Sequence, residues 1–157
     1  GDAETVFGDG TNWKSPTSSL ITLGSWGGVN SSSYGYVAYC FAEIPGFSKF
    51  GSYTGNGSAD GGFVYTGFRP RYVLTKCVST TGDWRIYDAM RPGYNVQGGT
   101  LLADTSGQET TATEIDFTAN GFKLRVATDP NSAQTFVYAA FAESPFGGSN
   151  CYPAPAR

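Results

Sequence analysis

Thr135-Phe-Val-Tyr-Ala-Ala-Phe-Ala-Glu-Ser-Pro145-Phe146 is the stretch that decides the fold, and a near-copy stands 100 positions earlier as Gly35-Tyr-Val-Ala-Tyr-Cys-Phe-Ala-Glu-Ile-Pro45-Gly46. Each copy is a short aromatic and aliphatic run that ends in Phe-Ala-Glu-x-Pro, which favours a buried strand over a helix. The proline has no N–H for a β-ladder, so it is expected to end the strand. Five positions are identical: Val37 and Val137, Phe41 and Phe141, Ala42 and Ala142, Glu43 and Glu143, Pro45 and Pro145. This internal repeat predicts the closing strand of a structural unit, present twice.

The repeat divides the chain into four expected parts. Residues 1–45 are expected to be the C-terminal strands of an incomplete repeat unit, and residues 63–146 a complete β unit. Residues 46–62 are expected to be an ordered connector. Phe47, Phe50 and Tyr53 interrupt a sequence that is otherwise typical of a flexible linker, and these aromatic side chains should pack against another part of the protein. Residues 147–157 are expected to be an extended tail. A start in the middle of a unit, without an initiator Met, suggests a chain that was cut or is part of a longer product.

The composition predicts an all-β fold. Glycine (22 residues) and aromatics (15%) are abundant, while charged residues also make up only 15%; short alternating runs of this kind are typical of strands. The Asn120-Gly121 pair between two alternating segments indicates a hairpin, and residues 72–77 alternate so that Val73, Thr75 and Cys77 share a face. We therefore expect an antiparallel β-sandwich or a jelly-roll-like fold with about ten short strands. The expected strands cover residues 5–7, 19–23, 35–43, 63–69, 71–78, 84–89, 100–104, 114–118, 122–126 and 136–143.

Charge and composition exclude several classes of function. The net charge is −3 and the basic residues are scattered, so no basic stripe follows a nucleic-acid backbone. No apolar run reaches the about 18 residues of a membrane span, so membrane insertion is not expected. Histidine is absent, which removes Ser-His-Asp and Cys-His catalysis. Cys40, Cys77 and Cys151 are odd in number and lack metal-site spacing, so we expect reduced thiols, no metal and no cofactor.

Five motifs in a fixed order resemble a known domain. They are Gly-Phe-Arg-Pro-Arg-Tyr-Val-Leu-Thr-Lys (67–76), Gly-Asp-Trp-Arg-Ile-Tyr-Asp (82–88), Leu-Leu-Ala-Asp (101–104), Ile-Asp-Phe-Thr-Ala-Asn-Gly-Phe-Lys-Leu (115–124) and Tyr-Ala-Ala-Phe-Ala-Glu-Ser-Pro-Phe (138–146). Together they are similar to a domain of unknown function that recurs in virion and tail-fibre-type proteins of tailed bacteriophages, often after a concanavalin-like lectin domain. The resemblance covers roughly residues 36–146. The resemblance implies that the protein is a component of a virus particle, and it assigns no catalytic residue.

Carboxylates are the candidates for chemistry. Asp83, Asp88, Asp104, Glu114 and Asp116 fall in one unit, so two of them could stand the ~5–9 Å apart that a glycosidase needs. The favoured interpretation is structural, because strand ends and turns of β-proteins ordinarily carry such acids. Asp88 and Arg91 are interpreted as an Asx-type turn with a salt bridge. The repeated glutamates at 43 and 143 are interpreted as architectural, each with a hydrogen bond or an ion pair to an arginine.

Four aromatic residues in Gly- and Ser-rich loops are the candidates for ligand or interface contact: Trp13, Trp26, Tyr53 and Tyr94. Rings in polar loops stack on sugars or anchor protein interfaces, and we favour the interface. The alternative is that they cover the ends of the sandwich.

The resulting functional prediction is a non-enzymatic structural or adhesion component of a tailed-phage virion, namely a tail fibre, a receptor-binding module or a capsid-decoration module. Its expected partners are copies of itself, forming a trimer if it is a fibre, other virion proteins and a host-surface glycan. One alternative is a carbohydrate-binding module of a secreted bacterial surface protein. Another is a glycan hydrolase, since a two-carboxylate mechanism needs no histidine.

Overall fold

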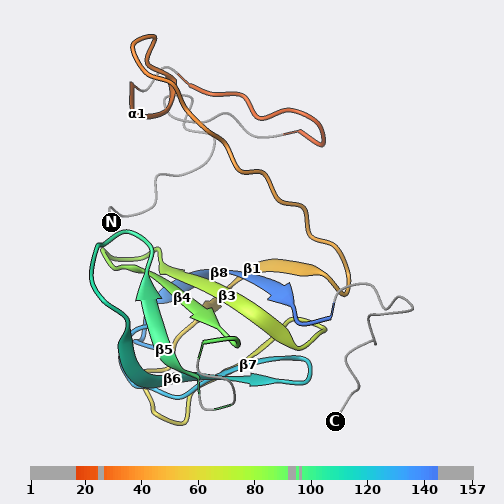
Figure 1. The fold of residues 1–157 in the computed structure, drawn as a ribbon, viewed down its shortest axis with the longest axis vertical. Helices are drawn as coiled ribbons and strands as arrows, with labels where there is room; N and C mark the ends of the chain where they lie inside the picture. The colour runs from red at the N-terminus through yellow and green to blue at the C-terminus, as the bar shows by residue number, and fades with distance from the viewer. Residues whose placement is uncertain (1–16, 25–26, 92–94, 96, 145–157) are drawn as a thin grey trace. The chain divides into compact units, whose positions relative to one another are not determined.

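The computed structural model describes residues 17–24, 27–91, 95 and 97–144. The chain divides into two units, Glu4–Phe41 (the N-terminal unit) and Ala42–Arg157 with Gly1–Ala3 (the β unit). The described part of the N-terminal unit contains α1 (Gly27–Asn30), and that of the β unit contains eight strands (Figure 1). They are β1 (Ser48–Thr54), β2 (Phe63–Tyr65), β3 (Pro70–Cys77), β4 (Trp84–Asp88), β5 (Gln97–Leu102), β6 (Thr110–Thr118), β7 (Gly121–Leu124) and β8 (Thr135–Ala142). The predicted all-β fold is confirmed.

All strand pairs are antiparallel, and they form one sheet in the order β1-β8-β3-β4-β5-β6-β7-β2. The sheet bends at β5, whose C-terminal half pairs with β4 and whose N-terminal half pairs with β6. The register shifts between Gln97 and Gly99, and such a bulge beside glycine lets a strand turn a corner. The bend places β1, β8, β3 and β4 in one layer and β6 and β7 in another (Figure 1), as expected for a sandwich.

The core lies between these two layers. Val73 of β3 and Tyr87 of β4 meet Ile115 of β6 and Phe122 of β7, and all four are 0% exposed. The same cluster includes Tyr138 and Ala140 of β8, Val64 of β2, Phe68, Phe117 and Leu124. Burial of large apolar side chains from both layers supplies the main stabilisation of such a fold.

Alternation along β3 follows the predicted pattern. Val73, Thr75 and Cys77 are buried on the same face of β3. The repeat strand at residues 136–143 is β8, which lies between β1 and β3 and pairs with both. The aromatics of the expected connector dock as predicted: Phe47 and Phe50 pack edge-on against Phe141, with ring centroids 6.1 and 5.9 Å apart.

Three expectations about the first third of the chain are wrong. Residues 35–43 and 19–23 were expected to be strands, and neither forms one. Residues 46–62 were expected to connect two units, but they contain β1, which is hydrogen-bonded to β8 and belongs to the β unit. β1 is an edge strand whose two aromatic residues, Phe50 and Tyr53, stand three positions apart, so its sequence lacks the alternation that marks β3. The strand expected at residues 5–7 and the tail at 147–157 lie outside the described residues.

The predicted β6–β7 hairpin is confirmed, but Gly121 lies outside its two-residue loop. Thr118 pairs with Gly121, so the two loop residues are Ala119 and Asn120. Gly121 has no positive φ. It is instead crowded by β2, because a Cβ there would lie 2.1 Å from the carbonyl oxygen of Val64. Gly121 therefore permits the close approach of β2 to β7 rather than a left-handed turn.

Gly121→Ala is expected to lower the free energy of unfolding by about 1–3 kcal/mol, because the new methyl group would push β2 from its place. Gly62→Ala is the matched control, since no atom lies within 4 Å of a Cβ at Gly62. It should change stability by no more than about 0.5 kcal/mol. Urea denaturation of both variants checks this, and equal midpoints would contradict the crowding argument.

Candidate functional site

Glu114 of β6 is the buried carboxylate among the described residues, with 8% of its side chain exposed. Arg85 Nη1 donates to Glu114 Oε1 at 3.0 Å and to Oε2 at 3.2 Å. The hydroxyl of Tyr87 donates to Oε2 at 2.5 Å, and that of Thr100 does so at 3.0 Å. The carboxylate is thus held by three side chains from β4 and β5.

These contacts give the Glu114 cluster a structural role. Burial and the neighbouring Glu114 charge raise the pKa of Tyr87 well above its usual value, so the phenol stays a hydrogen-bond donor at neutral pH. A general acid or base must reach a substrate proton, whereas both oxygens of Glu114 already accept hydrogen bonds inside the protein. The arrangement fixes β4, β5 and β6 to one another at the point where the sheet bends.

Three other candidate carboxylates, Asp88, Asp104 and Asp116, also contact groups of the protein. Asp88 accepts a hydrogen bond from the backbone N–H of Met90 at 2.8 Å and lies 3.9 Å from Arg91 Nε, which confirms the interpretation as an Asx-type turn with a salt bridge. Asp104 accepts from the N–H of Trp84 at 3.2 Å. Asp116 Oδ2 lies 3.0 Å from the Nε of Arg125. Among the residues that the structure describes, no group of three or more His, Cys, Asp or Glu side chains could hold a metal ion.

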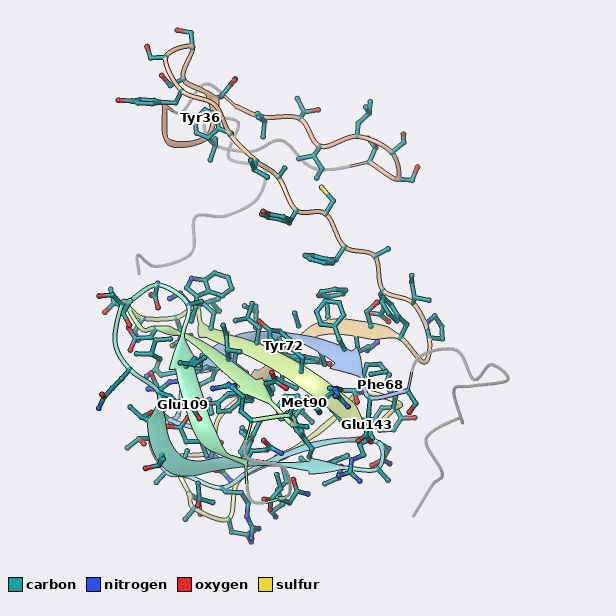
Figure 2. All side chains as sticks on the ribbon, in the orientation of Figure 1. Tyr36, Phe68, Tyr72, Met90, Glu109 and Glu143 are labelled. Atoms are coloured by element: carbon teal, nitrogen blue, oxygen red, sulfur yellow. The ribbon has the colours of Figure 1, made fainter. Side chains whose placement is uncertain are left out.

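The two repeated glutamates each pair with a cation. Glu143, just after β8 (Figure 2), lies 3.2 Å from the Nε of Arg69. Glu43 lies 2.5 Å from the Nζ of Lys49. The predicted ion pair to an arginine is confirmed for Glu143, while Glu43 uses a lysine. The four side chains of these pairs are between 35% and 48% exposed, so each pair contributes what a surface ion pair does, about 0–1 kcal/mol.

Of the four aromatic candidates, the structure describes Tyr53, and Trp13, Trp26 and Tyr94 lie outside the described residues. Tyr53 was expected in a loop and lies instead on β1. Its ring stacks on Phe136 with centroids 5.3 Å apart, and its hydroxyl donates to the carbonyl of Pro130 at 2.8 Å. Burial, followed by the nearby Asp129 charge, raises the pKa of Tyr53. These contacts make Tyr53 part of the core, and contact with a ligand stays a prediction.

The described part of the N-terminal unit has an exposed apolar surface that the predicted strands did not indicate. The exposed fractions are 65% for Leu20, 78% for Val37 and 82% for Tyr39. Leu23, Ile21, Tyr34, Tyr36 and Phe41 are exposed as well. The sequence held a signal for this surface: residues 15–42 contain no charged side chain, and Lys14 and Glu43 flank the run. We call the exposed apolar residues between 20 and 41 the apolar surface.

The hydroxyl of Tyr36 shapes this unit locally. It donates to the carbonyl of Gly27 at 2.6 Å and accepts from the N–H of Ser31 at 3.1 Å, which ties it to the segment around α1 (Figure 2). Asn30 Nδ2 donates to the carbonyl of Gly24 at 2.9 Å. A hollow of about 1010 Å³ lies within the unit and is lined mainly by residues 17–23 and 36–40. Its walls are uncharged and mostly apolar, with hydroxyl groups from Thr17, Ser18 and Ser19, so they suit apolar groups better than an anion or a metal.

No described helix has the length and apolar character needed to cross a membrane. In a comparison with known families, the model of a family described as "Domain of unknown function (DUF7483)" matches residues 1–145. No curated protein and no solved structure matches the chain. The resemblance to phage virion proteins therefore stays a prediction.

Proposed function

Because the chain belongs to the DUF7483 family of domains of unknown function, we propose a function from its surfaces: it is a non-enzymatic assembly or adhesion module. The observation that carries this proposal is the exposed, charge-free apolar surface of the N-terminal unit. Large exposed apolar surfaces typically mark protein interaction sites. Four of the five carboxylates that suggested chemistry, Asp88, Asp104, Glu114 and Asp116, make contacts within the protein.

The assembly that we propose is the virion of a tailed bacteriophage, in which the chain serves as a tail fibre, a receptor-binding module or a capsid-decoration module. The support is the ordered set of motifs between residues 67 and 146, which resembles domains of virion proteins. The proposed partners are copies of the chain itself and other virion proteins. A β-sandwich joined in one chain to an apolar segment suits such a role, because a folded scaffold can carry a segment that makes contacts.

Quantitative mass spectrometry of purified particles tests this proposal. We expect the chain in the particles at a defined copy number, and an integer multiple of three if it is a fibre. Complete absence from particles whose genome encodes the chain would overturn the virion role. Release of sugars from host polysaccharide by the purified chain, abolished by substitution of a described carboxylate, would overturn the non-enzymatic role.

A carbohydrate-binding module is the second candidate, and one observation favours it. Tyr34 and Tyr39 are 73% and 82% exposed, and exposed aromatic rings stack on sugar faces. A glycan array with the purified chain tests this candidate. Binding that disappears in Tyr39→Ala would favour the module, whereas an unchanged array signal would remove this surface as the sugar site.

A further inference from the structure

Two Asn-Gly pairs stand in turns of the β unit, Asn56-Gly57 between β1 and β2 and Asn120-Gly121 at the β6–β7 turn. The asparagine of such a pair loses ammonia when the backbone nitrogen of the glycine attacks the side-chain carbonyl carbon and closes a five-membered ring. Glycine has no Cβ, so it leaves that nitrogen open to the reaction. The rate then depends on what holds the side-chain amide and on how readily the peptide nitrogen gives up its proton. The two pairs differ in both respects.

The fold holds the side-chain amide of Asn56 in place. Its Oδ1 accepts hydrogen bonds from the backbone N–H of Ser58 at 3.0 Å and from Asn131 Nδ2 at 2.8 Å. Its Nδ2 donates to the carbonyl of Asp60 at 3.2 Å. The N–H of Gly57 donates to the carbonyl oxygen of Asn131 at 2.7 Å. A deprotonated nitrogen there would face the lone pairs of that oxygen, so ring closure at Asn56 is opposed.

The peptide group that joins Asn120 to Gly121 has the opposite surroundings. The carbonyl oxygen of Asn120 accepts hydrogen bonds from the N–H of Thr66 at 2.9 Å and from that of Gly67 at 3.1 Å. When the nitrogen of Gly121 loses its proton, negative charge spreads onto this oxygen, and the two N–H donors stabilise it as an oxyanion hole does. Asn120 is exposed, and its side chain makes no hydrogen bond within the part of the chain that the structure describes. No contact therefore holds its amide away from the nitrogen of Gly121.

The packing of β2 against β7 accounts for both features of this site. A Cβ at Gly121 would lie 2.1 Å from the carbonyl oxygen of Val64, so the approach of β2 favours glycine after Asn120. Thr66 and Gly67 follow β2 directly, and the same approach brings their N–H groups to the carbonyl of Asn120. One strand contact thus supplies the glycine and the pair of donors.

We propose that Asn120 is a site of spontaneous deamidation in the folded protein, whereas the fold protects Asn56 from the same reaction. The nitrogen of Gly121 gives up its proton to hydroxide and bonds to Cγ of Asn120, and the Cγ–Nδ2 bond breaks as ammonia leaves with a proton from water. Water then opens the cyclic imide. Cleavage of the new Cγ–N bond gives aspartate, and cleavage of the original bond to the backbone carbonyl carbon gives isoaspartate. This modification requires only the folded β unit and is independent of the proposed assembly role.

Peptide mapping by mass spectrometry of the full-length chain, incubated at mildly alkaline pH, tests the proposal because both pairs are measured in one sample. In the folded chain we expect Asn120 to convert at least about 10-fold faster than Asn56, less than the ~10²-fold that one oxyanion donor contributes in an enzyme. In denaturant the two rates should become similar, because the unfolded chain keeps both Asn-Gly pairs and loses their contacts. Asn120→Gln is the matched control, since ring closure would need six members and position 120 should stay unmodified.

Three results would overturn the proposal. One is conversion of Asn56 at least as fast as that of Asn120 in the folded chain, or no conversion at either position. Another is a ratio of the two rates that is the same in denaturant, which would show that the neighbouring sequence, not the fold, distinguishes the pairs. The third is aspartate without isoaspartate at position 120, which would show direct hydrolysis of the amide without ring closure.

Discussion

Glu114→Gln is expected to lower the free energy of unfolding by about 3 kcal/mol, the lower end for removal of one partner of a buried ion pair. Glutamine keeps the shape of the side chain and removes its charge. Arg85, whose side chain is 20% exposed, then carries a positive charge without its counter-ion, and Tyr87 and Thr100 lose a charged acceptor. The partial exposure of Arg85 keeps the loss from being larger.

Glu109→Gln is the matched control, because Glu109 pairs with Arg91 at 2.8 Å but its side chain is 38% exposed (Figure 2). It should cost no more than about 1 kcal/mol. Urea denaturation at neutral pH compares the two variants, and similar losses would refute the argument from burial. A double variant, Arg85→Met with Glu114→Leu, should recover part of the stability that Glu114→Leu alone loses, because no unpaired charge remains.

The strands that could be predicted from the sequence have strong local patterns. β3 alternates, β6 and β7 flank an Asn-Gly signal, and β8 is a dense aromatic run. Residues 35–43 have nearly the same composition as β8 and form no strand in the structure. A segment forms a strand only where neighbouring strands pair with it, and the sequence of the segment alone does not identify those neighbours. Strand propensity therefore predicted a strand at both copies of the repeat, and pairing with neighbouring strands formed one only at the second copy.

The buried role of Glu114 could not be predicted for a related reason. Strict alternation would place Glu114 and Ile115 on opposite faces of β6, with Ile115 in the core. The register shift between Gln97–Ile115 and Gly99–Thr111 leaves more residues on β6 than on β5. Such a bulge redirects side chains, and here consecutive residues, Glu114 and Ile115, are both buried. The buried ion pair thus depends on strand pairing, which could not be predicted from the sequence.

Asn131→Asp is expected to lower the free energy of unfolding by about 4 kcal/mol at neutral pH, by adding an unpaired buried charge to lost hydrogen bonds. Asn131 is 0% exposed. Its Nδ2 donates to Asn56 Oδ1 at 2.8 Å and to the carbonyls of Ser58 and Val126 at 2.7 and 2.8 Å. A carboxylate would point an oxygen at three other oxygens. Asn131→Ala should lose less, about 3 kcal/mol, because it brings no charge.

The position of Asn131 explains why its loss should affect the whole sheet. Residues 55–62 run from the end of β1 to the start of β2, the two edge strands, and Asn131 fixes this segment to the segment after β7. Burial raises the pKa of an aspartate here above its unfolded value of about 3.9. The loss of unfolding free energy caused by Asn131→Asp should therefore be largest above that folded pKa. It should fall as the pH drops through the folded pKa, because the neutral carboxyl carries no charge and can donate a proton.

Asn120→Asp, the same change in the exposed hairpin loop, should change the free energy of unfolding by no more than about 0.5 kcal/mol at every pH. Denaturation midpoints of both variants between neutral and acidic pH measure this, and a pH-independent cost would show that lost geometry, not charge, destabilises the variant.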